Sequence, residues 1–157
     1  DGGLLDCGRA DLGSCGNACC ALEVAVDVTP EQIYSKLTGF LRAGGDEGAY
    51  RHVPGTMLHK EHPADDVRSP SSPWQYIVQG QHVTSGRHYV DTLNFNVRTS
   101  PDGLTVLRGF SVSDLHGSLG DAGQNYKSLA YLLRALGVDP AGATVLHGCG
   151  GAAAGAA

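Results

Sequence analysis

The sequence has little positive charge and no long hydrophobic run. Eleven lysines and arginines stand against sixteen aspartates and glutamates, which gives a formal net charge of −5. Nucleic-acid-binding proteins normally present a basic surface, so this balance argues against a nucleic-acid partner. No apolar stretch approaches the roughly 20 residues of a membrane-spanning helix, so no membrane span is expected.

Motifs for catalysis and for cofactor binding are also missing. The sequence contains no G-x-G-x-x-G, no phosphate-binding loop and no G-x-S-x-G, so nothing indicates a nucleotide site or a nucleophilic serine. The seven histidines follow no zinc-ligand spacing, and we interpret them as loop residues, His82 among them. The acidic pairs Asp46-Glu47 and Asp65-Asp66 are interpreted as solvated. The sequence therefore predicts no catalytic set, no metal site, no cofactor and a protein that is not an enzyme.

Cysteine is concentrated at one end of the chain. The N-terminal four follow the spacing C-x7-C-x3-C-C, which lacks the C-x-x-C pairs typical of zinc and favours disulfides. Disulfides predict an oxidising compartment, and we expect a secreted protein. The odd count leaves one thiol free, buried or paired with another molecule. We expect the last cysteine to pair with the N-terminal cluster. The five candidates are Cys7, Cys15, Cys19, Cys20 and Cys149.

Two further features bear on processing and modification. Asp1 as first residue and a single methionine, Met57, are typical of a processed chain. No N-x-[ST] sequon occurs. The proline-rich stretch 69–73 contains three serines that are candidates for O-glycosylation, which would make carbohydrate a covalent partner. These are Ser69, Ser71 and Ser72.

The first half of the chain predicts a strand followed by a helix. Apolar residues alternate over 21–28, as in a strand with one buried face. Thr29 and Gln32 then form a capping box around Pro30, which suits the first helical position. Apolar residues recur with helical spacing as far as Leu41, and Gly44 ends the helix.

The second half predicts three turn-linked strands and a second helix. The strands cover 74–81, 87–99 and 104–113, and the second helix ends at Leu136. A short strand is also expected near 57–60. In the third of the turn-linked strands the residues expected to face inward are Leu104, Val106, Phe110 and Val112.

Together these elements define an α+β fold: an antiparallel sheet with two helices on one face, in the order β-α-β-β-β-β-α. We expect three parts: a Cys/Gly-rich arm over 1–20, a single domain over 21–140 and a Gly/Ala-rich tail over 141–157.

A set of carboxylates and amides remains after the core is assigned. We interpret it as the solvated outer face of the sheet. In the alternative interpretation, this face meets another subunit. Asp121 is expected to cap the second helix. The set consists of Asp91, Asn94, Asn96, Asp114, Asp121 and Asn125.

The strands Tyr89–Phe95 and Gly109–Ser113 and the segment Leu119–Lys127 resemble a domain-of-unknown-function family, numbered 1499, found in bacteria and algae. In that family a D-x-G-x-N-[RK] stretch precedes the terminal helix, and here the basic residue comes one place late, at Lys127. Cys15–Cys19 is similar to a cysteine-containing segment of that family, without its prolines. The resemblance covers 89–136 and implies no established activity. The cysteine-rich arm resembles a secreted algal variant of the family.

A second resemblance is architectural. The strand over 24–28 that runs directly into the helix ending at Leu41 resembles the opening of helix-grip lipid-binding domains. That resemblance implies a cavity beneath residues 126–136, which would hold an apolar ligand.

The odd cysteine, the glycine-rich ends and the free sheet edges favour a secreted, non-enzymatic structural protein. We expect it to assemble with itself into an extracellular filament or coat through its terminal arms. The alternatives are a helix-grip carrier of a small apolar ligand and a thiol-dependent enzyme that uses Cys19 and Cys20. The assembly candidates in the arms are Gly2, Leu4, Leu5, Gly150, Ala153 and Ala156.

Overall fold

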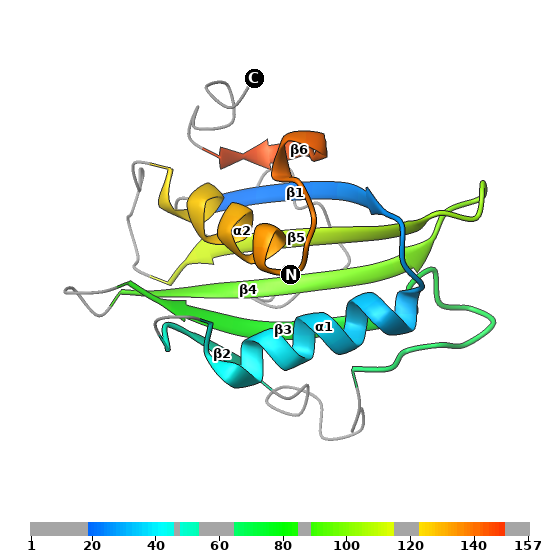
Figure 1. Cartoon of the computed structure of the whole chain (residues 1–157), viewed down its shortest axis with the longest axis horizontal. Coiled ribbons are helices and arrows are strands. Elements are labelled where there is room, and N and C mark those ends of the chain that lie inside the picture. Colours follow the sequence, from blue (N-terminus) through cyan, green and yellow to red (C-terminus); the bar gives the residue numbers. More distant parts are fainter. Residues whose placement is uncertain (1–18, 46–47, 54–64, 85–88, 115–122, 150–157) are drawn as a thin grey trace.

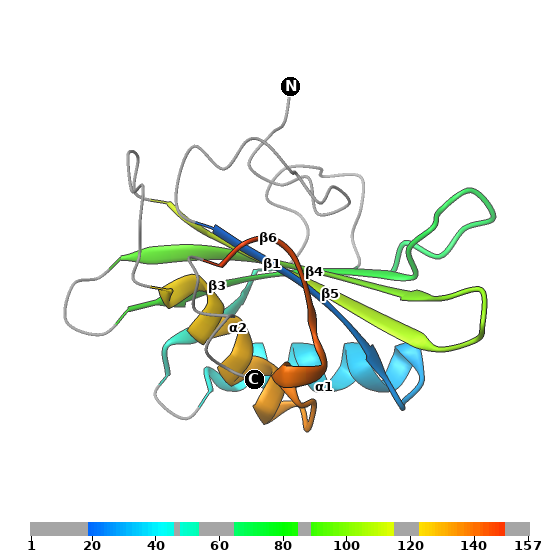
Figure 2. The ribbon, with the colours of Figure 1, turned by 90° about the horizontal axis from the view of Figure 1, so that it is seen from above.

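A computed structural model describes residues 19–45, 48–53, 65–84, 89–114 and 123–149. These residues form one six-stranded antiparallel sheet in the order β2-β3-β4-β5-β1-β6. Both helices pack on the same face of it, as Figures 1 and 2 show. The predicted α+β fold is confirmed. The elements are β1 (Cys19–Val26), α1 (Pro30–Ala43), β2 (Tyr50–Val53), β3 (Tyr76–Val83), β4 (Val90–Thr99), β5 (Thr105–Ser113), α2 (Gln124–Ala135), a 3-10 turn (Pro140–Gly142) and β6 (Thr144–Gly148).

Helix α1 begins and ends where the sequence predicts. The Thr29 side chain accepts a hydrogen bond from the Gln32 backbone N–H, and the Gln32 side chain accepts one from the Thr29 N–H. Gly44 ends the helix with φ of 88°, a left-handed conformation that glycine adopts at low cost. Ile33, Leu37 and Leu41 are fully buried.

Helix α2 has a different start. Gly123 occupies its N-cap position in a left-handed conformation, and no side chain caps the helix there. The predicted cap, Asp121, lies outside the described residues. The predicted apolar stripe is confirmed, because Leu129, Leu132 and Leu136 are all buried against the sheet.

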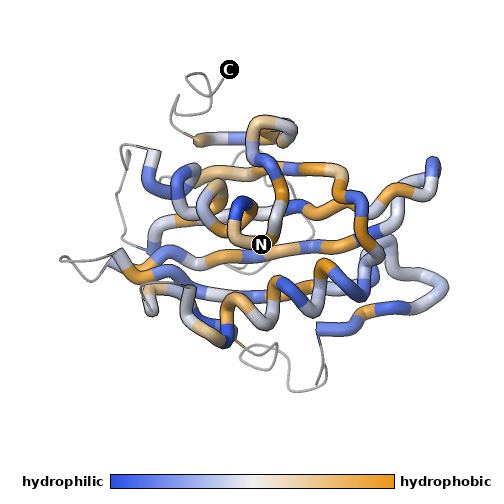
Figure 3. Tube along the Cα trace, viewed as in Figure 1, coloured by the Kyte–Doolittle hydropathy of each residue, from blue (hydrophilic) through white to orange (hydrophobic). Residues whose placement is uncertain are grey.

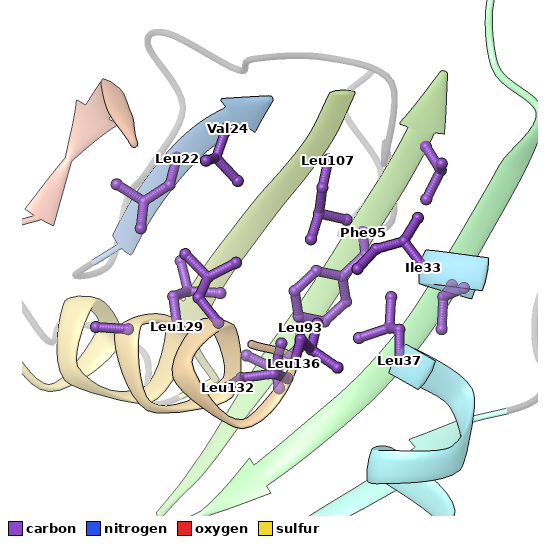
Figure 4. Packing of buried hydrophobic residues seen from close by; sticks show 14 of the residues in the cluster. Leu22, Val24, Ile33, Leu37, Leu93, Phe95, Leu107, Leu129, Leu132 and Leu136 are labelled. Atoms are coloured by element: carbon purple, nitrogen blue, oxygen red, sulfur yellow. The ribbon is translucent and has the colours of Figure 1, made fainter. Parts of the chain in front are cut away.

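The core lies between the helices and one face of the sheet. Figure 4 shows leucines of α2 meeting Ile33 and Leu37 of α1 over Leu93 and Phe95 of β4. Hydrophobic segments alternate with hydrophilic ones along α1 and along the central strands (Figure 3). This alternation is typical of elements that are buried on one side only.

The prediction for the buried face of β5 is wrong. The strand pairing places Thr105, Leu107, Gly109, Ser111 and Ser113 on the helix-covered face, and Leu104 is 47% exposed. A Cβ on Gly109 would lie 3.2 Å from Phe95 and 3.3 Å from Leu129. Gly109 thus leaves room for the Phe95 side chain on the neighbouring strand and for Leu129 of α2. This explains why the face of β5 that contains glycine and serine, rather than Phe110 and Val112, is turned towards the core.

Strand β6 extends the sheet into the predicted tail. It pairs with β1 at the edge of the sheet, so the domain continues past its expected boundary at residue 140. Directly after β6, Cys149 forms a disulfide with Cys20 of β1, which confirms the expected link between the two ends. Cys19 is also disulfide-bonded.

The disulfide between Cys20 and Cys149 stabilises the fold by restricting the unfolded chain. It closes a loop with a sequence separation of 129 residues, and loops of this length are worth about 4–5 kcal/mol in the chain-entropy treatment. We predict that replacing both cysteines with alanine lowers the free energy of unfolding by about 3–5 kcal/mol. Urea denaturation measures the loss.

Hydrogen exchange of the variant that lacks the Cys20–Cys149 disulfide then shows which strands are destabilised. The backbone amides of β6 should lose protection before those of β4, because β6 pairs with one neighbour only. Unchanged protection in β6 after removal of the disulfide would contradict the role given to this bond.

Candidate ligand-binding site around His82

Four side chains from four neighbouring strands form a row on the helix-covered face of the sheet. Tyr50 of β2 is opposite His82 of β3, His82 is opposite Asp91 of β4, and Asp91 is opposite Ser113 of β5. Directly opposite residues share one face of a sheet, so the strand register alone brings the four together. All four are buried.

His82 is held through one of its two ring nitrogens. Its Nδ1 lies 3.4 Å from Asp91 Oδ2 and 3.2 Å from Ser128 Oγ of α2. The Ser128 hydroxyl donates to the Gln124 carbonyl, so its oxygen can only accept from the ring. An ionised carboxylate accepts as well. Nδ1 therefore carries a proton, and in the neutral imidazole Nε2 keeps its lone pair.

A chain of hydrogen bonds supports Asp91 from behind. The Ser113 hydroxyl donates to Asp91 Oδ1 over 2.9 Å, and Asn125 Nδ2 donates to Ser113 Oγ over 3.0 Å. The Ser111 hydroxyl in turn donates to Asn125 Oδ1. Asn125 and Ser111 are fully buried. The carboxylate is thus held by donors from β3 and β5, and β5 is linked to the first turn of α2.

A pocket of about 210 Å³ opens next to the imidazole. Among the described residues, both hydrogen bonds of the His82 ring go through Nδ1, so Nε2 is the nitrogen that can meet a molecule in the pocket. The Tyr50 hydroxyl donates to the Ser128 carbonyl over 3.0 Å and thereby fixes the wall. The pocket is lined by Ala49, Tyr50, His82, Gln124, Lys127, Ser128 and Tyr131.

The presence of Ser128, His82 and Asp91 in one cluster does not make a serine nucleophile. In such triads the serine and the aspartate contact opposite nitrogens of the imidazole, so that a proton can pass across the ring. Here both contact Nδ1. The arrangement orients the ring and presents Nε2 as a hydrogen-bond acceptor or a base towards the pocket.

A second histidine–carboxylate pair lies at the other end of β2. His52 Nε2 is 3.1 Å from Asp65 Oδ2, and the Tyr34 hydroxyl donates to the same oxygen over 3.3 Å. Burial, and then the nearby Asp65 charge, raise the pKa of the Tyr34 hydroxyl. Tyr34 also stacks on Tyr76 with 4.3 Å between ring centroids. This cluster ties the segment around Asp65 to α1.

The structure corrects the interpretation of several polar residues. His82, expected in an exposed turn, lies within β3 and is buried. Asp65, expected to be solvated, is also buried. Asp91 and Asn125 belong to the helix-covered side, and Asn94 and Asn96 are only 3% and 2% exposed on the other face. Of the predicted outer-face set, Asp114 alone is exposed among the described residues.

The other predicted residues fall into two groups. Ser69 and Ser71 are exposed, whereas the Ser72 hydroxyl donates to the Trp74 carbonyl over 2.7 Å. The remaining arm residues lie outside the described part of the chain: Cys7, Cys15, Gly2, Leu4, Leu5, Gly150, Ala153 and Ala156.

Comparison with known proteins gives no assignment: no protein family and no curated protein matches the sequence. The resemblance of residues 89–136 to the family numbered 1499 stays a prediction. Within the described residues no three histidine, cysteine or acidic side chains gather as metal ligands would. In the same part of the chain, neither helix has the length and apolar character needed to cross a membrane.

We predict that Asp91→Asn changes the tautomer of His82. The asparagine Oδ1 can still accept from Ser113, which places its NH2 group opposite Nδ1 and forces the ring proton to Nε2. The weaker pairing should lower the free energy of unfolding by about 1–3 kcal/mol. Imidazole 15N chemical shifts report the tautomer.

Asp114→Asn is the matched control, because Asp114 is exposed and is bonded to Thr92. It should leave the His82 signals unchanged. Finding the same His82 tautomer in the wild type and in Asp91→Asn would contradict the assignment of the Nδ1 proton.

Proposed function

We propose that the protein is a disulfide-stabilised binding domain that takes up a small polar molecule in the pocket beside His82. One observation carries this proposal. The sheet and α2 use buried hydrogen-bonding groups to hold His82 by Nδ1, and the ring borders a pocket. Such networks cost desolvation energy, and oriented titratable groups in concave sites are typical of ligand-binding centres.

The proposal also covers the compartment in which the protein works. The Cys20–Cys149 disulfide supports an oxidising environment, and we propose that the protein is secreted.

The apolar-carrier alternative finds less support beneath the middle of α2 than at the C-terminal end of this helix, where a separate pocket of about 390 Å³ is lined by Val24, Ile33 and Leu136 among others. Beneath α2 the side chains are packed: Leu129, Leu132 and Phe95 are each at most 1% exposed. A lipid-sized ligand in that position would need the helix to move away from the sheet.

We predict that His82→Gln abolishes ligand binding while the fold persists. Screening single-ring and sugar-sized soluble compounds by ligand-observed NMR should give hits that the variant loses, because glutamine cannot reproduce the oriented Nε2 acceptor. Changes in the backbone amide signals of Ser128 and Tyr131 should locate the hits in the pocket. His147→Gln, a half-buried histidine on β6, is the control and should keep the hits. Hits that survive His82→Gln, or that move no pocket signal, would overturn the proposal.

We retain self-assembly as a second candidate function because of one feature of β6. This strand lies at the sheet edge, and its Val145 is 40% exposed. Exposed strand edges readily pair with another strand, so a second copy of the chain is the proposed partner. Successive copies joined through such edges and the terminal arms would form a filament or coat.

If the protein assembles in this way, the full chain should have a mass above the 16.3 kDa of one copy in size-exclusion chromatography with light scattering. Val145→Lys should reduce that mass, because a charge on an edge strand opposes pairing. Leu104→Lys, at an exposed site in the β4–β5 connection, is the control. Removal of residues 150–157, which keeps Cys149, tests the tail. A wild-type monomer at high concentration would exclude assembly.

A further inference from the structure

The size of the pocket beside His82 restricts its ligand. An engineered apolar cavity of about 150 Å³ in another protein holds one benzene ring. The pocket beside His82 holds about 210 Å³ and is open to solvent, so its space takes one ring with one or two small substituents, and a larger ligand would extend into solvent. We propose that the ligand is a single-ring hydroxy acid, with its hydroxyl at His82 and its carboxylate at Lys127. This inference rests on the proposed function and specifies the ligand class.

The inner end of the pocket selects a hydrogen-bond donor. In the neutral imidazole, His82 Nε2 keeps its lone pair because Nδ1 carries the ring proton towards Asp91 and Ser128. A lone pair attracts a hydroxyl or an N–H group, and a ligand carboxylate at this point would face another acceptor. The hydroxyl of a phenol or of a cyclic alcohol is a donor that carries no positive charge towards Lys127.

The outer end of the pocket selects an anion. Lys127 is exposed, lies in the first turn of α2 and borders the pocket. That turn contains no acidic residue, although acidic residues stabilise helix N-termini. The lysine charge and the N-terminal end of the helix dipole thus act in the same direction. Lys127 makes a further contact in the structure, which an incoming carboxylate would join or displace.

Two neighbouring tyrosine rings form part of the pocket lining. The Tyr50 and Tyr131 rings lie nearly parallel, with an interplanar angle of 12° and 5.8 Å between centroids. Tyr50 also packs against His82, with 4.7 Å between ring centroids. Because Tyr50 is buried against these neighbours, the half-buried Tyr131 ring is the one that can stack with a planar ligand. None of the described lining residues has a carboxylate, so none of these side chains repels the anion.

The test compares three probes on the full-length protein by calorimetry and by backbone amide NMR. 4-Hydroxybenzoate has both groups, benzoate lacks the hydroxyl, and methyl 4-hydroxybenzoate lacks the charge. We expect 4-hydroxybenzoate to bind about tenfold more tightly than either of the others, since each analogue lacks one of the two groups that the pocket would bind. The signals of Ser128 and Tyr131 should shift.

Variants separate the two ends of the pocket. Lys127→Gln should remove the preference for 4-hydroxybenzoate over its methyl ester, whereas Lys36→Gln, an exposed lysine on α1, should preserve it. Equal binding of all three probes at the pocket, or pocket binding only by library compounds of another class, overturns the hydroxy-acid inference and leaves the binding site standing. Failure of every probe and every library compound to shift pocket signals overturns both.

Discussion

A buried carboxylate, that of Asp91, links the central strands of the sheet to helix α2. Asp91 lies on the helix-covered face of the central strand β4 and is only 2% exposed. An ionised group in that position is tolerated only when hydrogen bonds replace the water it has lost. His82 of β3 and Ser113 of β5 supply them, and Asn125 of α2 supports Ser113. The register of three strands and the position of the first turn of α2 are therefore coupled at one residue.

The same coupling gives His82 its chemical character. Because Asp91 and Ser128 both contact Nδ1, the neutral imidazole has its lone pair on Nε2. Tyr50 holds α2 in place through the Ser128 carbonyl. The pocket is thus lined both by this histidine and by Lys127. The disulfide between Cys20 and Cys149 is at the opposite edge of the sheet, where it secures β6 without entering this cluster.

Local patterns in the sequence predict most of the fold and little of the site. The capping box at Thr29 and the alternation in β1, β3 and β4 are short-range signals that predict these elements, whereas β2 and β6 are not predicted. Extending the buried alternation of Tyr76 and Val78 by four residues reaches His82, and that of Leu93 back by two reaches Asp91. The continued alternation was the signal in the sequence that His82 and Asp91 are buried. It was missed because polar residues at strand ends suggest turns. The alignment of these side chains across the sheet also depends on the strand order, which is set by long-range pairing. The wrong face for β5 came from local hydropathy. Phe110 and Val112 are more apolar than Gly109 and Ser111, so they were expected to face the core.

The most direct test of this account is a high-resolution crystal structure of the protein soaked with 4-hydroxybenzoate. The account predicts one ring in the pocket, its hydroxyl oxygen within hydrogen-bonding distance of His82 Nε2 and its carboxylate beside Lys127. An empty pocket, with Nε2 hydrogen-bonded to a group of the protein itself, would contradict it.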